Sequence, residues 1–133
     1  MNNIDLMNYW IDSSDEDYEA MKVLVNNNKN TWCLFIGHLV IEKLLKGLYA
    51  KKNKNAPYAP KVHDLLYLSE KVELTLTENQ ETLLSIITKF NINARYDDYK
   101  KEFQNKCTDE YTIEQIQNIE EVRTWLKNLL ATN

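Results

Sequence analysis

Glycine and proline are scarce in this chain of 133 residues, which holds two of each. Sandwiches and barrels built of short strands need many turn-forming residues, so this scarcity argues against them and favours long helices with few connections. Both glycines, Gly37 and Gly47, lie inside one helical segment. Their position excludes the glycine-rich loops that cradle phosphates in P-loop and dinucleotide-binding proteins.

Cysteine and histidine are equally scarce, again with two of each. Cys33 lies in an apolar helical run and Cys107 in a polar stretch, so we expect free thiols in a reducing cytoplasm rather than a disulfide framework. These cysteines and the two histidines, His38 and His63, lack the spacing of a zinc site, and there is no His-Glu-x-x-His motif. We therefore expect neither a metal nor a cofactor.

Long apolar runs are also missing. The longest, Trp32 to Ile41, is interrupted by Gly37 and His38 and is too short to span a bilayer. The N-terminal residues show no basic start followed by an apolar stretch, so we expect no signal peptide. With 44% hydrophobic residues, 27% charged residues and a net charge of −4, the chain has an ordinary composition and no overall attraction to nucleic acid. We expect one cytoplasmic domain over residues 1–133, with no membrane contact.

Apolar residues spaced by three and four predict two long helices, one after the other, in the first half of the chain. The first is expected from residue 4 to about Asn26, as one helix, although the "SSDE" segment could also start a new one. The second, Thr31 to about Lys51, is apolar on nearly every side. Such a helix is either central in the bundle or covered on one side by a partner subunit. Gly37 and Gly47 inside it suggest the close approach of a neighbouring helix.

Three further helices complete the predicted fold. A short one follows the proline-containing linker over residues 63–72. Capping-box spacing at Thr77 and Gln80 begins the fourth, and the same spacing at Thr112 and Gln115 begins the last. The segment between them, from about residue 93 to 111, is expected to be irregular. The prediction is an all-α, up-and-down bundle of five helices.

A narrow polar stripe marks the second helix, where His38, Glu42 and Lys46 follow one another at i, i+4 and i+8, with Lys43 beside them. One interpretation is an ordinary surface strip of weakly interacting side chains. The other is a polar groove in which Glu42 holds an arginine from elsewhere in the chain. The residues leave both open.

The segment "NARYDDYKKEF" (93–103) places Arg95 among tyrosines and lysines. The planar fork of Arg95 suits phosphate or carboxylate, Lys100 adds charge, and Tyr96 and Tyr99 could stack on bases. The alternative is structural, with Arg95 bridging helix ends or pairing with Glu42.

Four segments together resemble a HEPN (higher eukaryotes and prokaryotes nucleotide-binding) domain, over about Asp12 to Leu130. They are "SDEDYEAMKVLV", "HLVIEKLLKGLYA", "VHDLLYL" and "ARYDDY", in the order of that family. The resemblance implies a five-helix bundle of HEPN type, commonly a homodimer, with a polar cleft near the second helix and Arg95. It also implies a setting beside a minimal nucleotidyltransferase, in a toxin–antitoxin-like pair.

Ribonuclease members of this family carry a histidine shortly after the arginine. In this chain Lys100, Lys101 and Glu102 stand at those positions, and no histidine follows His63. A lysine titrates near ~10.4 and is a poor acid–base group at neutral pH. We therefore predict no catalytic residues and favour a protein that is not an enzyme, without deciding the question.

The predicted function is a non-catalytic module that binds a nucleotide or another anion, or a nucleotidyltransferase partner. The predicted anion-binding residues are Arg95 first, then Lys43, Lys46 and Lys100; the supporting residues are Glu42, His38, Tyr96 and Tyr99. One alternative is a metal-independent HEPN ribonuclease toxin acting on RNA. The other is a ligand-free helical scaffold in which Arg95 and Glu42 form a buried pair.

Overall fold

The computed structural model describes residues 1–132, and over that span the protein consists of six α-helices without strands. The helices are α1 (Asn3–Asn26), α2 (Asn30–Lys52), α3 (Leu65–Lys71), α4 (Glu78–Arg95), α5 (Asp97–Lys106) and α6 (Asp109–Ala131). The all-helical prediction is confirmed. In the described residues no helix is long and apolar enough to cross a membrane.

The expected count of five helices is wrong because the segment predicted to be irregular contains α5. Two acidic residues in its first turn and Lys106 in its last complement the helix dipole. Phe103 is its one buried residue, with its ring 5.8 Å from that of Phe90 on α4. A single apolar anchor leaves no periodic stripe in the sequence, so the pattern did not reveal this helix.

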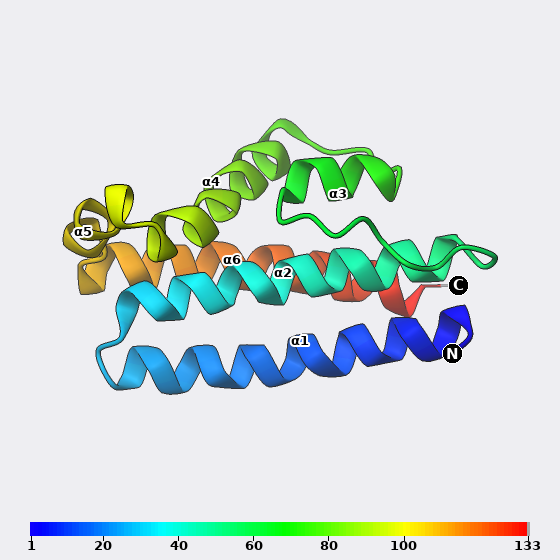
Figure 1. Ribbon diagram of the computed structural model, residues 1–133, viewed down its shortest axis with the longest axis horizontal. Helices are drawn as coiled ribbons and strands as arrows, with labels where there is room; N and C mark the ends of the chain where they lie inside the picture. Colours follow the sequence, from blue (N-terminus) through cyan, green and yellow to red (C-terminus); the bar gives the residue numbers. More distant parts are fainter. Residues whose placement is uncertain (133) are drawn as a thin grey trace.

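The three longest helices, α1, α2 and α6, run side by side along the molecule (Figure 1). In the same view α1 runs opposite to α2 and α6, while α4 crosses α2 obliquely and α3 and α5 lie at the two ends of α4. The neighbours α1 and α2 are antiparallel, as in an up-and-down bundle, whereas the neighbours α2 and α6 run in the same direction. Helix α2 packs against all five other described helices, so it is the centre of the bundle.

The central position of α2 explains its apolar circumference. Cys33, Leu34, Val40, Ile41, Leu44 and Leu45 on this helix are all fully buried. The chain's own helices cover most of α2, and Trp32 at its start remains exposed.

Close helix approach at Gly37 is confirmed. A Cβ atom there would lie 2.4 Å from Ile119 Cδ1 on α6 and 3.1 Å from Met21 Sδ on α1. At Gly47 the nearest neighbours of a Cβ would be 3.5 Å away, which is ordinary contact. A Cβ atom at Gly37 would therefore have to displace the terminal methyl of Ile119, whereas one at Gly47 would fit without displacing a neighbour.

The first helix continues through its serines, as predicted. Ser14 is fully buried and its hydroxyl donates to the Val40 carbonyl at 2.8 Å, so the polar break in the apolar stripe is satisfied by the backbone of α2.

Two helix starts test the capping predictions. The box at Thr77 and Gln80 is present, with both reciprocal hydrogen bonds. The predicted cap at Thr112 is wrong, because α6 begins earlier and Thr108 accepts from the Tyr111 amide at 3.2 Å. Thr112 is buried inside the helix.

Candidate functional site

Arg95 is the last residue of α4, and the side chain of Asn91, one turn earlier, fixes its guanidinium. Arg95 Nε donates to Asn91 Oδ1 at 2.9 Å and to the Asn91 carbonyl at 3.3 Å. A terminal nitrogen of the guanidinium also donates to Asn91 Oδ1. Asn91 is 2% exposed whereas Arg95 is exposed. A buried amide thus holds a surface arginine in one orientation.

Aromatic rings surround this guanidinium. Arg95 Cζ lies 5.9 Å from the centre of the Phe35 ring on α2 and 5.3 Å from that of Tyr96. The Trp32 ring is 5.7 Å from the Phe35 ring and carries Lys100 Nζ at 5.3 Å. We call these five residues the Arg95 surface. Cations within about 6 Å of ring centres are attracted to the ring faces.

The two cations of the Arg95 surface have no acidic partner in the part of the chain that the structure describes. Within residues 1–132, no carboxylate oxygen lies within 4.0 Å of a side-chain nitrogen of Arg95 or Lys100. Asn91, the hydrogen-bond partner of Arg95, is neutral. The charge of the guanidinium is therefore oriented but not neutralised, which is the state that suits an incoming anion.

A buried hydrogen-bond chain leads from Asn91 into the bundle. His38 is fully buried, and its Nε2–H donates to the His63 carbonyl at 2.8 Å. In a neutral imidazole the other nitrogen must then accept, and Asn91 Nδ2 lies 3.4 Å from His38 Nδ1. This contact turns the amide nitrogen of Asn91 inward and its oxygen outward to Arg95. The orientation of Arg95 thus depends on the tautomer of His38.

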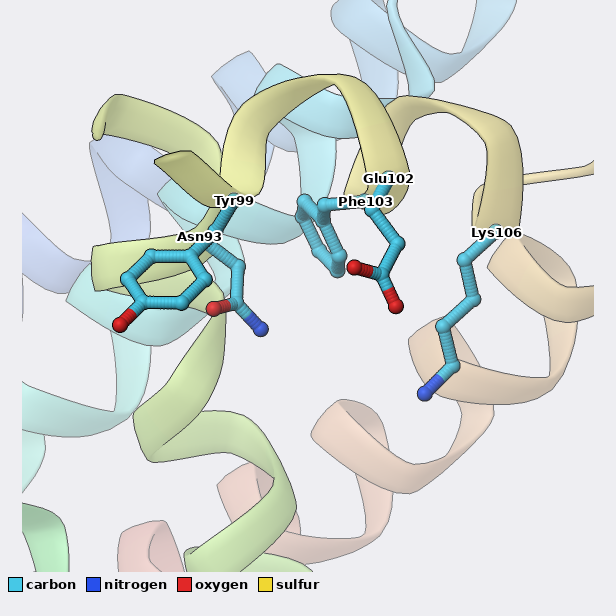
Figure 2. Close-up of a pocket in the computed structure, with 5 residues that line it drawn as sticks. All are labelled: Asn93, Tyr99, Glu102, Phe103 and Lys106. Atoms are coloured by element: carbon cyan, nitrogen blue, oxygen red, sulfur yellow. The ribbon is translucent and has the colours of Figure 1, made fainter. Parts of the chain in front are cut away.

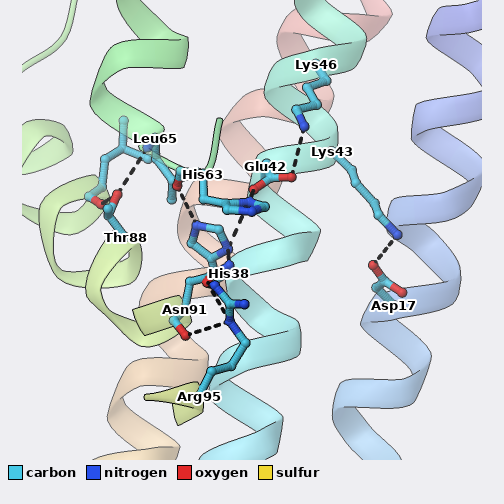
Figure 3. A network of polar contacts seen from close by, with 11 residues as sticks. Asp17, His38, Glu42, Lys43, Lys46, His63, Leu65, Thr88, Asn91 and Arg95 are labelled. Carbon is cyan, nitrogen blue, oxygen red and sulfur yellow. Dashed lines mark hydrogen bonds and ion pairs between the residues drawn. The ribbon is translucent and has the colours of Figure 1, made fainter. Parts of the chain in front are cut away.

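The far end of the chain of contacts is a buried carboxylate. Glu42, which is 5% exposed, accepts from His63 Nδ1 at 2.6 Å and from Lys46 Nζ at 3.1 Å. Figure 3 shows the succession from Arg95 through Asn91, the histidines and Glu42 to Lys46 along one side of α2.

The sequence was compared with models of known protein families. The family described as HEPN domain matches residues 7–129, nearly the whole chain. This chain belongs to the HEPN domain family. The comparison with curated proteins returned no match, and neither did the comparison with solved structures.

In this HEPN domain the polar stripe on α2 is buried rather than a solvated surface strip, and Glu42 has a different partner from the expected one. The expected pairing of Glu42 with Arg95 is wrong. Glu42 binds His63 and Lys46, and Asn91 holds Arg95. The linker before α3 places His63 next to α2, where it binds Glu42 in place of the expected Arg95.

The four predicted anion-binding residues separate into two pairs. Lys43 Nζ lies 2.6 Å from Asp17 Oδ2 and donates to Ser13 Oγ at 2.8 Å, and in Figure 3 it points to α1, away from Arg95. Lys46 is bound to Glu42, with its side chain 11% exposed. The geometry leaves Arg95 and Lys100 as the cations available to a ligand.

His38 supports the HEPN site from inside rather than at its surface. Burial lowers the pKa of His38 from its ordinary value, an effect opposed by the hydrogen bond with the His63 backbone. Both of its ring nitrogens are engaged. His38 therefore orients other residues, and it cannot exchange protons with a ligand bound at the surface. The thiol of Cys33 is similarly inert, because burial raises its pKa to about 12.

The two predicted tyrosines lie on different sides of this region. Tyr96 contacts Arg95, as described above. Tyr99 instead lines a shallow hollow of about 150 Å³ with Asn93, Glu102, Phe103 and Lys106 (Figure 2). Asn93 and Arg95 are two residues apart on a helix and so point in nearly opposite directions. The hollow, with its carboxylate, is distinct from the Arg95 surface.

Asn91 was not predicted as a site residue, and the partner of His63 was not predicted either. Asn91 stands four residues before Arg95, a spacing at which helix side chains meet, and this was the available signal. His63 lacks such a signal because its partner Glu42 is 21 residues away in sequence.

Proposed function

We propose that this HEPN domain is a non-catalytic module that binds the phosphate of a nucleotide, free or within single-stranded RNA, at the Arg95 surface. The observation that carries the proposal is the exposed guanidinium of Arg95, which a buried amide orients and no carboxylate of the described chain neutralises. An arginine fork held in this way binds phosphate with little loss of side-chain entropy.

The rings around Arg95 support a nucleotide rather than a simple anion. Tyr96 is 53% exposed and Trp32 is 38% exposed, so each presents a ring face or edge to solvent. Exposed aromatic rings beside cations are typical of sites where unpaired bases stack, at about 1–3 kcal/mol per base. Lys100 over Trp32 would contact a second phosphate.

The proposal excludes cleavage because the site lacks an acid–base group placed like that of the ribonuclease members. Lys100 occupies the sequence position of the missing histidine, and His38 is buried with both nitrogens bonded. Incubation of purified protein with single-stranded RNA in EDTA tests this point. No cleavage is expected, whereas cleavage lost in Arg95→Ala would replace the binding module with an enzyme.

The central experiment measures binding of a labelled single-stranded RNA by fluorescence anisotropy and of uridine monophosphate by calorimetry. Arg95→Ala should weaken binding by roughly tenfold or more, because a hydrogen-bonded charge contact contributes about 1.5–3 kcal/mol. Arg95→Lys should restore only part, since it keeps the charge and loses the fork.

Lys101→Ala serves as the matched control, because it removes an exposed cation on the neighbouring helix α5, next in sequence to Lys100. Its affinity should stay within twofold or so of the parent at moderate salt. Unchanged RNA and nucleotide binding in a folded Arg95→Ala protein would contradict the proposal.

The scaffold alternative required a buried pair between Arg95 and Glu42, and the structure does not contain that pair. A scaffold role would still make Arg95 important for stability. A thermal melt of Arg95→Ala separates the two roles, because the binding role predicts a melting temperature close to that of the parent.

We extend the proposal to a nucleotidyltransferase partner in a toxin–antitoxin-like pair and to a homodimer, on the strength of the family resemblance. Copurification from the native host tests the partner, and sedimentation or light scattering of the isolated protein tests the dimer. A monomer that retains RNA binding would remove the dimer and leave the Arg95 surface as proposed.

A further inference from the structure

His63 is an exposed histidine whose ring is fixed by a buried carboxylate. Its side chain is 58% exposed, and its Nδ1 lies 2.6 Å from Oε1 of Glu42, which is almost fully buried. Glu42 is in turn fixed by Lys46 at 3.1 Å. An exposed side chain normally samples several rotamers, so this restraint is a feature that requires an explanation.

The backbone around His63 is also held. Its carbonyl accepts from His38 Nε2 at 2.8 Å, and the next residue, Asp64, caps α3 by accepting from the Leu66 and Tyr67 amides at 3.0 and 3.2 Å. The ring is therefore restrained at its backbone and at Nδ1, and the remaining nitrogen, Nε2, has one fixed direction.

The bond to Glu42 also decides what Nε2 offers. Because Nδ1–H donates to the carboxylate, a neutral His63 ring carries its lone pair on Nε2. No residue of the described chain forms a hydrogen bond with that nitrogen. In its neutral form His63 thus presents an oriented hydrogen-bond acceptor at the surface, which fits a ligand hydroxyl.

This acceptor belongs to the same region as Arg95. The His63 and His38 rings are 6.2 Å apart, and His38 contacts Asn91, which holds Arg95. Figure 3 shows His63 and Arg95 on the same side of α2, one on either side of His38. One site would therefore offer a donor fork for phosphate and an acceptor for hydroxyl.

We propose that His63 is a specificity-determining residue, which accepts a hydrogen bond from a sugar hydroxyl of the nucleotide whose phosphate Arg95 binds. The site then favours ribonucleotides over deoxyribonucleotides, since the 2′-hydroxyl distinguishes the two. This inference rests on the proposed function of the Arg95 surface and deepens it.

The test compares two labelled single strands of equal length, oligouridylate and oligodeoxyuridylate, by fluorescence anisotropy at one salt concentration. The parent protein should bind the ribose strand about three- to tenfold more tightly, the range of one hydrogen bond. His63→Asn keeps an amide donor for Glu42 and removes the acceptor at the position of Nε2, because the shorter asparagine side chain has no atom there. It should bind both strands with the affinity of the deoxyribose strand.

Lys61→Gln is the control in the same linker, because Lys61 is exposed and two residues from His63. It should retain the ribose preference. Equal binding of both strands by the parent, or an unchanged preference in His63→Asn, would overturn the inference. Ribose-strand cleavage in EDTA that disappears in His63→Asn would also overturn it, because the ring would then act as a base.

Arg95→Ala distinguishes failure of this inference from failure of the proposed function. In that variant the binding of both strands should weaken by a similar factor, which supports the proposed function. If His63→Asn in addition removes only the preference for the ribose strand, the inference on His63 is supported too. If Arg95→Ala leaves both affinities unchanged, the proposed function fails whatever His63 does.

Discussion

The two arginines of the chain show how the same side chain is used in two ways. Arg123 on α6 faces α1, with a guanidinium nitrogen 3.1 Å from Asp15 Oδ1 and its Cζ 3.8 Å from the centre of the Tyr18 ring. Arg95 on α4 faces solvent, next to the amide of Asn91. Helix α2 lies between α1 and α4. The α1–α6 side neutralises its arginine, and the α4 side leaves its arginine charged and available.

Charge placement around Asp15 confirms the structural use of Arg123. Burial alone would raise the pKa of Asp15, but Lys127 at 2.8 Å and Arg123 together lower it below its ordinary range. The Tyr18 hydroxyl donates to Glu120 at 2.5 Å, which raises the pKa of Tyr18. These contacts join α1 to α6. The two arginines thus differ in the charge of their partners, a neutral amide for Arg95 and a carboxylate for Arg123.

The largest expected effect is that one arginine matters for RNA binding and the other for stability. Arg95→Ala should weaken RNA binding roughly tenfold or more at nearly constant melting temperature, as argued above. Arg123→Ala should leave binding unchanged and lower the free energy of unfolding by about 1 kcal/mol, since its ion pair is partly exposed and the Tyr18 contact adds a similar small amount. Anisotropy and chemical denaturation of both variants measure this difference. Similar behaviour of the two would break the comparison.

Asn91→Asp should give Arg95 a carboxylate partner, like the one that Asp15 provides for Arg123. A carboxylate at this position would neutralise the guanidinium and repel phosphate, so affinity should fall at least several-fold although Arg95 remains. Asn91→Asp also removes the donor to His38 Nδ1, so the pH dependence of stability should change with it. Binding equal to that of the parent would show that the neutral partner is unimportant.

Gly37→Ala perturbs the α1–α6 side by packing alone. Its Cβ would lie 2.4 Å from Ile119 Cδ1, so we expect a net loss of about 1–2 kcal/mol of stability despite alanine's better helix propensity. Gly47→Ala is the control, and with contacts of 3.5 Å or more it should gain up to about 1 kcal/mol. Denaturant titrations give both values, and RNA affinity should be unchanged in both folded variants.

The two regions should also respond to different pH ranges. Burial lowers the pKa of His38 in the folded protein below its ordinary 6.5, so the unfolded chain takes up the proton first. Stability is therefore full above that value and falls as the pH drops below it, with a slope of at most about 1.4 kcal/mol per unit for one proton. Asp15, with its pKa lowered from 3.8, contributes a loss only at more acidic pH. Melting curves between neutral and mildly acidic pH should show the first loss in the parent and less of it in His38→Gln.

The smallest effect is expected at the edge of the Arg95 surface. Lys100→Ala removes a partly exposed cation over Trp32 and should weaken RNA binding by about two- to threefold at moderate salt, with a reduced salt dependence. Lys101→Ala should change neither quantity as much. Equal effects of the two lysines would show that only net charge matters there.

Much of the fold followed from the sequence. The spacing of apolar residues predicted α1, α2, α3, α4 and α6, and the pair Thr77 and Gln80 predicted the start of α4. These features are local, because a helix repeats every 3.6 residues and its cap spans a single turn. Helix α5 was missed because one buried phenylalanine makes no pattern.

Within the candidate site, the sequence predicted Arg95 among aromatic and basic residues after the fourth helix, whereas in the structure it is the last residue of α4. Only the tertiary structure decided which partners the polar side chains take. Asn91 and His38 are 53 residues apart, and His63 and Glu42 are 21 apart, so their contacts depend on how α4 and the linker cross α2. Buried polar groups form hydrogen bonds with the groups that packing brings near them. In this fold Glu42 therefore binds His63, and Arg95 contacts the neutral amide of Asn91 instead of a carboxylate.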